Sequence, residues 1–190
     1  MELKTLVFEK RGPANTDATL AIAVERALAL SIKQIIVASS HGGTAKKAQA
    51  LCAPHGIKVI AVSLGHSFAD QGWPMTPEET QSLHELGVVT VTGIHALGDN
   101  VGTAFAAKYS GYPTAQVVRD TLYRFGQGMK VAVEDILMAA EAGVVDMNAE
   151  VVSVAGSSTG ADTAIVCKPA CARTFHDLEI REVLAKPRIP

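Results

Sequence analysis

The residues best suited to chemistry stand directly after apolar, strand-like runs, in loops rich in glycine, hydroxyl and imidazole groups. The most informative loop, 39–44, leads from one such run straight into a helical pattern. Glycines let a backbone approach a ligand closely, and a helix start offers unpaired amides and the positive end of a dipole. This chemistry suits a phosphate monoester. The residues expected to contact it are Ser39, Ser40, His41, Gly42, Gly43 and Thr44.

The same loop also fits an ordinary capped strand-to-helix turn. It lacks the Gly-Lys-Ser/Thr ending of a Walker loop, and it does not follow the G-x-G-x-x-G pattern of dinucleotide-binding proteins. Taken alone, these residues leave phosphate binding and a plain turn as alternatives.

A second loop, Gly156–Gly160, formally matches the G-x-S-x-G pattern in which Ser158 would be a hydrolase nucleophile. A strand-like run follows it instead of a helix, and the later Asp-then-His order is absent because Asp177 follows His176. A hydrolase is therefore the weaker alternative. The favoured interpretation is a tight hairpin or a second ligand-facing loop that includes Gly160 and Asp162.

Acid–base chemistry is a further alternative, because imidazoles stand at several predicted strand ends. The candidate catalytic residues are His95, Asp162 and Glu134. Lys130 and Glu134 also have the i, i+4 spacing of an ordinary surface ion pair. No two histidines have the i, i+4 spacing of a helical metal motif, so the sequence predicts no metal site.

Composition excludes several classes of partner. Lys and Arg number 17 against 19 Asp and Glu among 190 residues, and aromatic residues make up 5%. A nucleic-acid surface would show a basic excess, and the longest uncharged run, Leu86–Gly98, is well short of the roughly 20 apolar residues of a membrane span. Three cysteines, Cys52, Cys167 and Cys171, fit reduced, packed thiols, and no export signal is visible. We therefore expect a cytoplasmic protein with no nucleic-acid or membrane partner.

The elements that must position these loops alternate along the chain. Short apolar runs predict strands, and segments of helical period lie between many of them, which is typical of βαβ units and a parallel sheet. Helices are expected from near Asn15–Thr16, from Thr44 to before Pro54, and after Thr76–Pro77. The predicted strands are Thr5–Glu9, Gln34–Ala38, Lys58–Ser63, Val88–Thr92, Glu150–Ala155 and Thr163–Lys168.

The second half is more helical, with helices expected over Pro113–Phe125 and Met129–Ala142. The connection between the last two strands is too short for a parallel crossover, so that pair should be antiparallel. Leu178–Leu184 is expected to add an edge strand. No repeat or linker divides the chain, so residues 1–190 are expected to form one α/β domain.

Several short segments together resemble a family of small uncharacterised proteins that are similar to the C-terminal α/β domain of pyruvate kinase. The resemblance runs nearly end to end. The segments are Phe8-Glu9-Lys10 with Asn15-Thr16, Ile35–Gly42, Phe125–Glu134, Gly160–Ala164 and Asp177–Glu182.

The resemblance implies a three-layer α/β/α fold with a mixed, mostly parallel sheet of about five strands, in the order 3-2-1-4-5 with strand 5 antiparallel. It also implies a phosphorylated small molecule as ligand, since the Ser/Thr-Gly loop of pyruvate kinase holds a sugar phosphate there. Stand-alone members look like binders of flavin mononucleotide (FMN), so FMN is the expected cofactor.

Counting Thr5–Glu9 as strand one, we expect the ligand crevice where the strand order reverses, between strands one and four. Residues expected to line it, besides the phosphate loop, are Glu9, Lys10, Asn15, Thr16, His95, Gly160 and Asp162. The ring of FMN would need an apolar platform, for which Phe68, Trp73 and Tyr112 are the candidates. Three roles stay open: a ligand-binding domain, an enzyme (a flavin oxidoreductase or an acid–base catalyst on a sugar phosphate), and a regulatory sensor that could form homo-oligomers.

Overall fold

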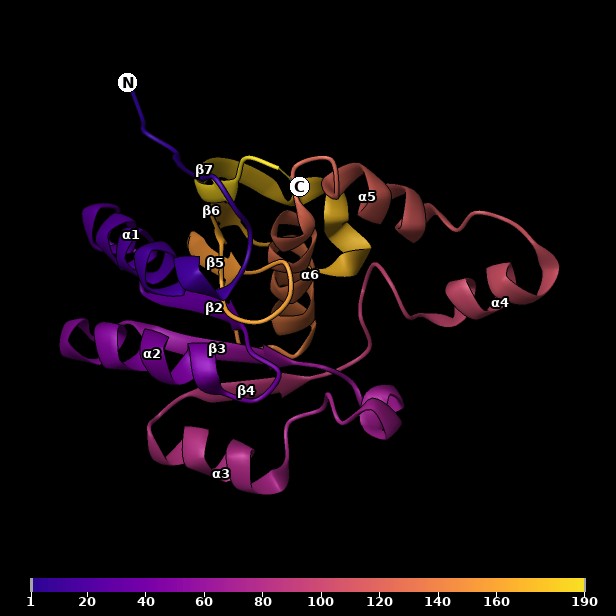
Figure 1. The fold of residues 1–190 in the computed structure, drawn as a ribbon, viewed down its shortest axis with the longest axis horizontal. Helices are drawn as coiled ribbons and strands as arrows, with labels where there is room; N and C mark the ends of the chain where they lie inside the picture. The colour runs from indigo at the N-terminus through magenta and orange to yellow at the C-terminus, as the bar shows by residue number, and fades with distance from the viewer. Residues whose placement is uncertain (1, 190) are drawn as a thin grey trace.

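In the computed structural model, which describes residues 2–189, one seven-stranded sheet runs through the molecule in the order β1-β7-β6-β5-β2-β3-β4 (Figure 1). The strands are β1 (Leu6–Phe8), β2 (Gln34–Ala38), β3 (Lys58–Ser63), β4 (Val89–Thr92), β5 (Val151–Ala155), β6 (Thr163–Lys168) and β7 (Glu179–Pro187). All pairs are parallel except those that β6 makes with β5 and β7. The α/β class and the mixed, mostly parallel sheet are confirmed, and the antiparallel last pair is β5–β6.

The expected order 3-2-1-4-5 describes the five strands β2 to β6, counted from β2. Two expectations at the other edge are wrong. The run at Thr5–Glu9 is not strand one of that series but a three-residue edge strand, β1, that pairs in parallel with β7. β7 in turn is not an edge strand, because it lies between β6 and β1. The apolar run at Thr5–Glu9 had implied a strand covered by helices on both faces. Leu6 and Val7 are exposed, so β1 is not covered in this way.

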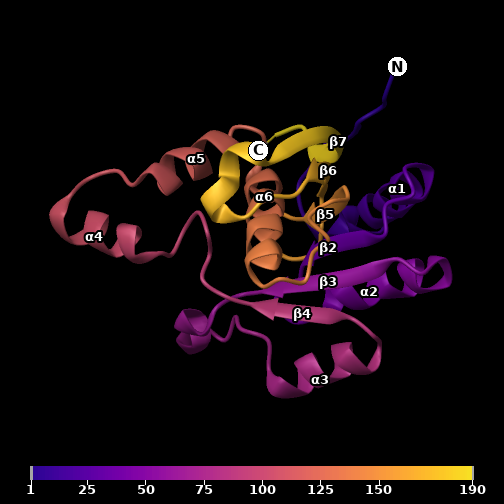
Figure 2. The ribbon, with the colours of Figure 1, turned by 180° about the vertical axis from the view of Figure 1, so that it is seen from behind.

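Helices cover both faces of the sheet and give it two separate cores. Alternate side chains of β2 point to opposite faces: Ile35 and Val37 belong to one core, and Ile36 belongs to the other. The first core lies beneath α1 (Thr16–Ala29), α2 (Gly43–Cys52) and α3 (Pro77–Glu85), and the second beneath α6 (Gln127–Glu141). In both views α6 lies on the side of β5 and β2 opposite to α1 and α2 (Figures 1 and 2).

The helix starts follow their local sequence. Thr76 caps α3 by accepting a hydrogen bond from the Glu79 amide, and the Glu79 carboxylate accepts the Thr76 amide, which completes a capping box. At the start of α1, the Asn15 side chain does not form the expected cap. Its Nδ2 group donates instead to the Lys10 carbonyl (2.7 Å).

One helix lies away from the sheet. α4 (Val101–Tyr109) extends from the body in both views (Figures 1 and 2), whereas α5 (Thr114–Leu122) packs against the second core through Val118 and Leu122. The helix expected over Pro113–Phe125 is confirmed as α5, whereas α4 was not predicted. Val101, Phe105 and Tyr109 have the i, i+4, i+8 spacing of one helix face, but all three side chains are exposed.

The strand directions bring the carboxyl ends of β2, β3, β4 and β5 to one edge. The order reverses between β2 and β5, where β2 pairs in parallel with both β3 and β5. Chains leaving two such strands turn toward opposite sides, and this opens a crevice in α/β sheets. The crevice therefore lies between β2 and β5, not beside β1.

The loop from β5 to β6 closes one side of this crevice and depends on Gly160. Its φ is +71°, and a Cβ there would lie 2.8 Å from Pro13 Cα and closer still to Thr16 Oγ1. The Thr16 hydroxyl accepts a hydrogen bond from the Ala161 amide (3.0 Å) and donates to the Pro13 carbonyl (2.7 Å). The loop is thereby fixed against the turn before α1.

We predict that Gly160→Ala destabilises the protein by about 2 kcal/mol more than Gly143→Ala. Gly143 has nearly the same φ, +69°, but a Cβ there meets nothing within 4 Å. Both variants incur left-handed strain of roughly 1–2 kcal/mol, and only Gly160→Ala adds an overpacking cost of about 1–3 kcal/mol. Urea unfolding of both variants measures the difference; equal losses would contradict the close packing of this loop.

Candidate functional site

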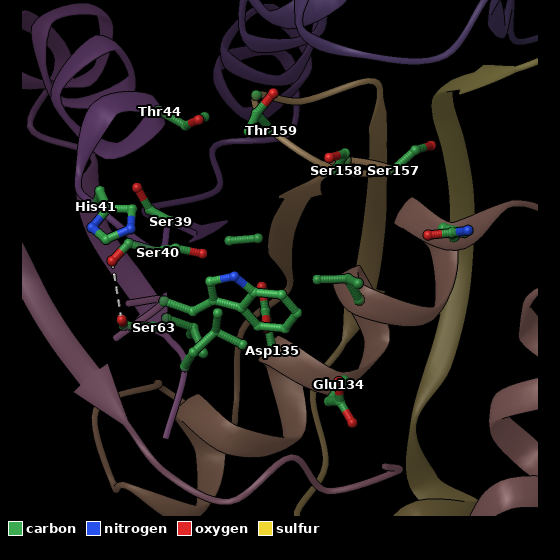
Figure 3. A pocket seen from close by; sticks show the side chains of 18 of the residues that line it. Ser39, Ser40, His41, Thr44, Ser63, Glu134, Asp135, Ser157, Ser158 and Thr159 are labelled. Atoms are coloured by element: carbon green, nitrogen blue, oxygen red, sulfur yellow. Dashed lines mark hydrogen bonds between the residues drawn. The ribbon is translucent and has the colours of Figure 1, made fainter. Parts of the chain in front are cut away.

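A pocket of about 620 Å³ opens at the carboxyl edge of the sheet, over the crevice between β2 and β5. Figure 3 shows Ser39, Ser40 and Thr44 on one side and Ser157, Ser158 and Thr159 on another, with Asp135 and Glu134 projecting from α6. The start of α2, the β5–β6 loop and one face of α6 therefore converge on the same space. Its lining residues are Ala38, Ser39, Ser40, His41, Gly43, Thr44, Val62, Ser63, Leu64, Trp73, His95, Gln127, Lys130, Val131, Glu134, Asp135, Gly156, Ser157, Ser158, Thr159 and Gly160.

The start of α2 presents backbone amides to the pocket. Gly42 adopts φ +80°, a left-handed conformation that glycine tolerates, and turns the chain from β2 into the helix. The Ala45 amide donates to Ser39 Oγ (3.3 Å). Gly43 and Thr44 stand in the first turn, where helix geometry leaves the N–H groups without intrahelical acceptors, and both residues line the pocket. This arrangement can bind an anion.

The β5–β6 loop is held by a buried carboxylate behind it. Asp162 Oδ2 accepts the amides of Gly12 (3.0 Å) and Ser157 (3.3 Å), and Oδ1 accepts the Thr163 hydroxyl (2.9 Å). Three hydrogen bonds compensate the loss of water around this buried side chain. Asp162 therefore positions the loop from outside the pocket lining.

Lys130 and Glu134 form a buried ion pair, which corrects the expectation of a surface pair. Their side chains are 7% and 2% exposed, and Glu134 Oε1 also accepts the Leu97 amide (2.8 Å). The two charges of such a buried pair sum to zero, whereas removal of one partner leaves the other charge buried and uncompensated. α6 thus brings both side chains to the pocket wall without making the pocket acidic.

Asp135 is the next residue of α6 and is also buried. Its Oδ2 atom has no hydrogen-bond partner among the described residues. Burial raises the pKa of this carboxyl group well above its ordinary value, and the neighbouring Glu134 carboxylate raises the pKa further, against the opposing effect of Lys130. The pocket therefore holds a neutral carboxylic acid over part of the pH range in which an exposed aspartate is ionised.

Three rings, those of Phe68, Trp73 and His95, lie together beside the pocket. Trp73, which is in the lining, stacks on Phe68 with ring centroids 5.5 Å apart, and the His95 ring lies 5.5 Å from Phe68. His95 Nδ1 donates to Asp99 Oδ2 (2.6 Å), which leaves Nε2 for another partner. Tyr112 is elsewhere, in the connection between α4 and α5, where its hydroxyl donates to Asp120.

The structure brings most of the predicted binding residues together. Those in the lining are Ser39, Ser40, His41, Gly43, Thr44, His95, Gly160 and the candidate catalytic residue Glu134. Gly42 turns the loop without lining the pocket. The others outside the lining are Glu9, Lys10, Asn15, Thr16 and Asp162. Glu9 and Lys10 follow β1, which lies at the edge of the sheet. They stay away from the crevice because the strand order reverses at β2 and not at β1.

Sequence reasoning missed several polar lining residues. Ser63 follows the apolar run of β3, and its hydroxyl donates to the Ser40 carbonyl (3.3 Å), a contact between neighbouring strand ends that a single sequence does not reveal. Asp135 and Lys130 lie in a helix that was interpreted as core. In the sequence the charged residues Lys130, Glu134 and Asp135 lie off the apolar stripe of this helix, as on an ordinary solvated face, so the pattern did not indicate that they are buried.

The remaining sequence alternatives concern other side chains. β6 follows the Gly156–Gly160 loop directly, so Ser158 is not on the strand–turn–helix elbow of a hydrolase. Cys52 and Cys167 are buried, and burial raises their pKa values to about 11 and about 12. Within residues 2–189 no three His, Cys, Asp or Glu side chains cluster as metal ligands, and no helix there could cross a membrane.

Comparison with known families adds one match. The family model described as "Pyruvate kinase, alpha/beta domain" matches residues 17–167. The matched segment begins in α1 and ends in β6, so it includes the start of α2, the crevice strands β2 and β5, and all of α6.

We predict that Asp135 makes stability depend on pH. Its folded pKa is raised, so its contribution is fully present below the unfolded pKa of about 3.9 and is lost as pH rises through the folded pKa. Between the unfolded pKa and the folded pKa, the free energy of unfolding of the wild type should fall by about 1.4 kcal/mol per pH unit relative to that of Asp135→Asn. Urea unfolding of both proteins from pH 4 to 8 measures this difference. A difference that does not change with pH would contradict the buried, neutral carboxyl group.

Proposed function

The chain belongs to the family of the pyruvate kinase alpha/beta domain, and from its pocket we propose that it binds a phosphorylated small molecule. The observation that carries this proposal is the convergence of the α2 amides with two hydroxyl-bearing loops on one 620 Å³ space. Helix starts bind phosphate groups because their amides and dipole both favour an anion. The phosphate would lie against Gly43 and Thr44, with hydroxyl groups of the two loops as additional donors.

The charges around the pocket support an anionic ligand. Its titratable lining residues are His41, His95, Lys130, Glu134 and Asp135. Lys130 offsets Glu134, and the raised pKa of Asp135 disfavours its charged form. Near the start of α2, His41 Nδ1 donates to Glu79 Oε2 (3.1 Å), so this carboxylate has its own partner. A phosphate at Gly43 therefore meets little uncompensated negative charge.

FMN is the best candidate for the whole ligand. Pockets for small molecules and cofactors have volumes of about 300–1,000 Å³ and combine apolar walls with a few polar groups. The wall away from α2 includes Val62, Leu64, Trp73 and Val131, which could hold a planar ring. FMN joins one phosphate monoester to such a ring, so both ends of the pocket would have a matching group.

The phosphate site is tested by Gly43→Asp, with Gly43→Asn as the neutral control of matching shape. A Cβ at this position meets nothing within 4 Å, so both variants should fold. A carboxylate in the first turn favours the helix dipole but repels a bound phosphate, and at an effective dielectric of 20–80 the repulsion is of order 1–3 kcal/mol. We predict that Gly43→Asp weakens binding of FMN and inorganic phosphate about tenfold or more in calorimetric titrations.

The control should keep binding within about threefold of the wild type, because Asn adds the bulk without the charge. Thermal stability of Gly43→Asp should be equal to or above that of Gly43→Asn. Unchanged phosphate affinity in Gly43→Asp would contradict a phosphate at this helix start.

Acid–base chemistry on a sugar phosphate is the second candidate, favoured by the His95–Asp99 hydrogen bond beside the pocket. An aspartate at Nδ1 orients the imidazole and leaves the Nε2 lone pair free to take a proton from a substrate. This alternative predicts that the wild type catalyses deuterium exchange from D₂O into ketose or aldose phosphates, followed by NMR. His95→Asn should abolish the exchange and keep sugar-phosphate binding; no exchange in the wild type would reject this candidate.

A further inference from the structure

Asp135 offers an oxygen atom, Oδ2, that no residue within 2–189 hydrogen-bonds. We propose that it determines which ligands the pocket accepts, by pairing with the lactam edge of a heterocyclic ring, where an N–H and a C=O stand side by side. This inference rests on the proposed phosphate site, since it concerns the other end of the same ligand.

The first argument is the unpaired oxygen. Asp135 is 5% exposed, and its Oδ2 has no partner among the described residues, although the side chain lines the pocket. An unsatisfied buried polar atom destabilises a folded protein, so its presence calls for an explanation. The neighbouring acids are satisfied: Glu134 has Lys130 and the Leu97 amide, and Asp162 has three donors. A partner supplied by a ligand explains why Asp135 Oδ2 is left open, and the same holds for Ser157 Oγ, the other buried atom of the pocket lining without a partner among the described residues.

The second argument is the protonation state of this group. Burial and the Glu134 carboxylate both favour the neutral acid. A neutral carboxyl group donates through its O–H and accepts through its carbonyl oxygen, whereas a carboxylate only accepts. A lactam edge offers the complementary acceptor and donor at neighbouring atoms, so the two groups can form a pair of parallel hydrogen bonds.

The third argument is the apolar surroundings. Val131 lies one turn before Asp135 on α6, and Val62, Leu64 and Trp73 are further apolar residues of the lining. A sugar would bring several hydroxyl groups into a wall with few partners for them. A flat ring with a single polar edge buries its faces against these side chains and presents that edge to Asp135. The pocket therefore favours a phosphorylated heterocycle over a simple sugar phosphate.

The test compares Asp135→Leu with Asp135→Asn. Leucine has nearly the shape of aspartate and no polar atom, whereas asparagine keeps one donor and one acceptor in the same shape. The probes for calorimetric titration are FMN and uridine monophosphate, which carry lactam edges, and ribose 5-phosphate and inorganic phosphate, which do not. Thermal unfolding without ligand accompanies each titration.

We expect the wild type to bind at least one lactam probe at least tenfold more tightly than ribose 5-phosphate. Asp135→Leu should abolish this preference, leave inorganic phosphate binding unchanged within about twofold and raise Tm, because it removes the unsatisfied oxygen. Asp135→Asn should retain the preference within about threefold. A purely structural role would instead lower Tm in Asp135→Leu and leave the preference intact.

The two proposals fail in different ways. If inorganic phosphate and ribose 5-phosphate bind but no lactam probe binds better, or if Asp135→Leu keeps the preference, the role of Asp135 is rejected and the phosphate site stands. If Asp135→Asn loses the preference as Asp135→Leu does, the neutral-acid pairing is rejected. If no probe binds the wild type, both proposals are rejected.

Discussion

The pairing of β2 with β5 is the constraint from which the rest of the site follows. Ile35, Ile36 and Val37 pair in parallel with Val152, Ser153 and Val154, and both strands are buried. β3 pairs with the other edge of β2. The chain leaving β2 enters α2, whereas the chain leaving β5 turns toward β6. The start of α2 and the β5–β6 loop therefore face one another across a space that neither can fill. A slip of one residue in this register would exchange the two cores and remove the crevice.

α6 supplies one wall of this crevice. It packs beneath the sheet through Met129, Val133 and Ile136, and it brings Lys130, Glu134 and Asp135 to the pocket. Gly128 permits this closeness, since a Cβ there would lie 3.0 Å from Asp162 Oδ1 and closer still to Thr163. The Lys130–Glu134 ion pair supplies no net charge, and the raised pKa of Asp135 favours the neutral form of that carboxyl group. The pocket thereby places the start of α2, where we propose that a phosphate group binds, in the same space as the apolar side chains Val62, Leu64, Trp73 and Val131 and the carboxyl group of Asp135.

Much of this architecture could be predicted from the sequence, because the strands β2 to β6 are short apolar runs with turn residues between them. The turn from β2 into α2 could be predicted for the same reason, because Gly42 and Gly43 stand where a buried strand meets a helix. Phosphate binding at this turn stays a prediction. The place of β1 could not, because three residues contain too little pattern to distinguish an edge strand from a central one. Asp135 could not be predicted either, since its role depends on which face of α6 meets the open end of the crevice. α4 was missed although Val101, Phe105 and Tyr109 have helical spacing, because this short apolar face is not buried against the rest of the described structure.

The central claim is that a phosphate group binds at the start of α2, and a titration of the ¹⁵N-labelled protein with inorganic phosphate, followed by NMR, tests it most directly. The account predicts that the largest amide shifts, saturating together, belong to Gly43 and Thr44, with smaller shifts in the β5–β6 loop. The start of α6, which also faces the pocket through Gln127, provides the internal comparison. Saturating shifts centred on Gln127 and Gly128, or no saturable shifts at Gly43 and Thr44, would contradict the claim.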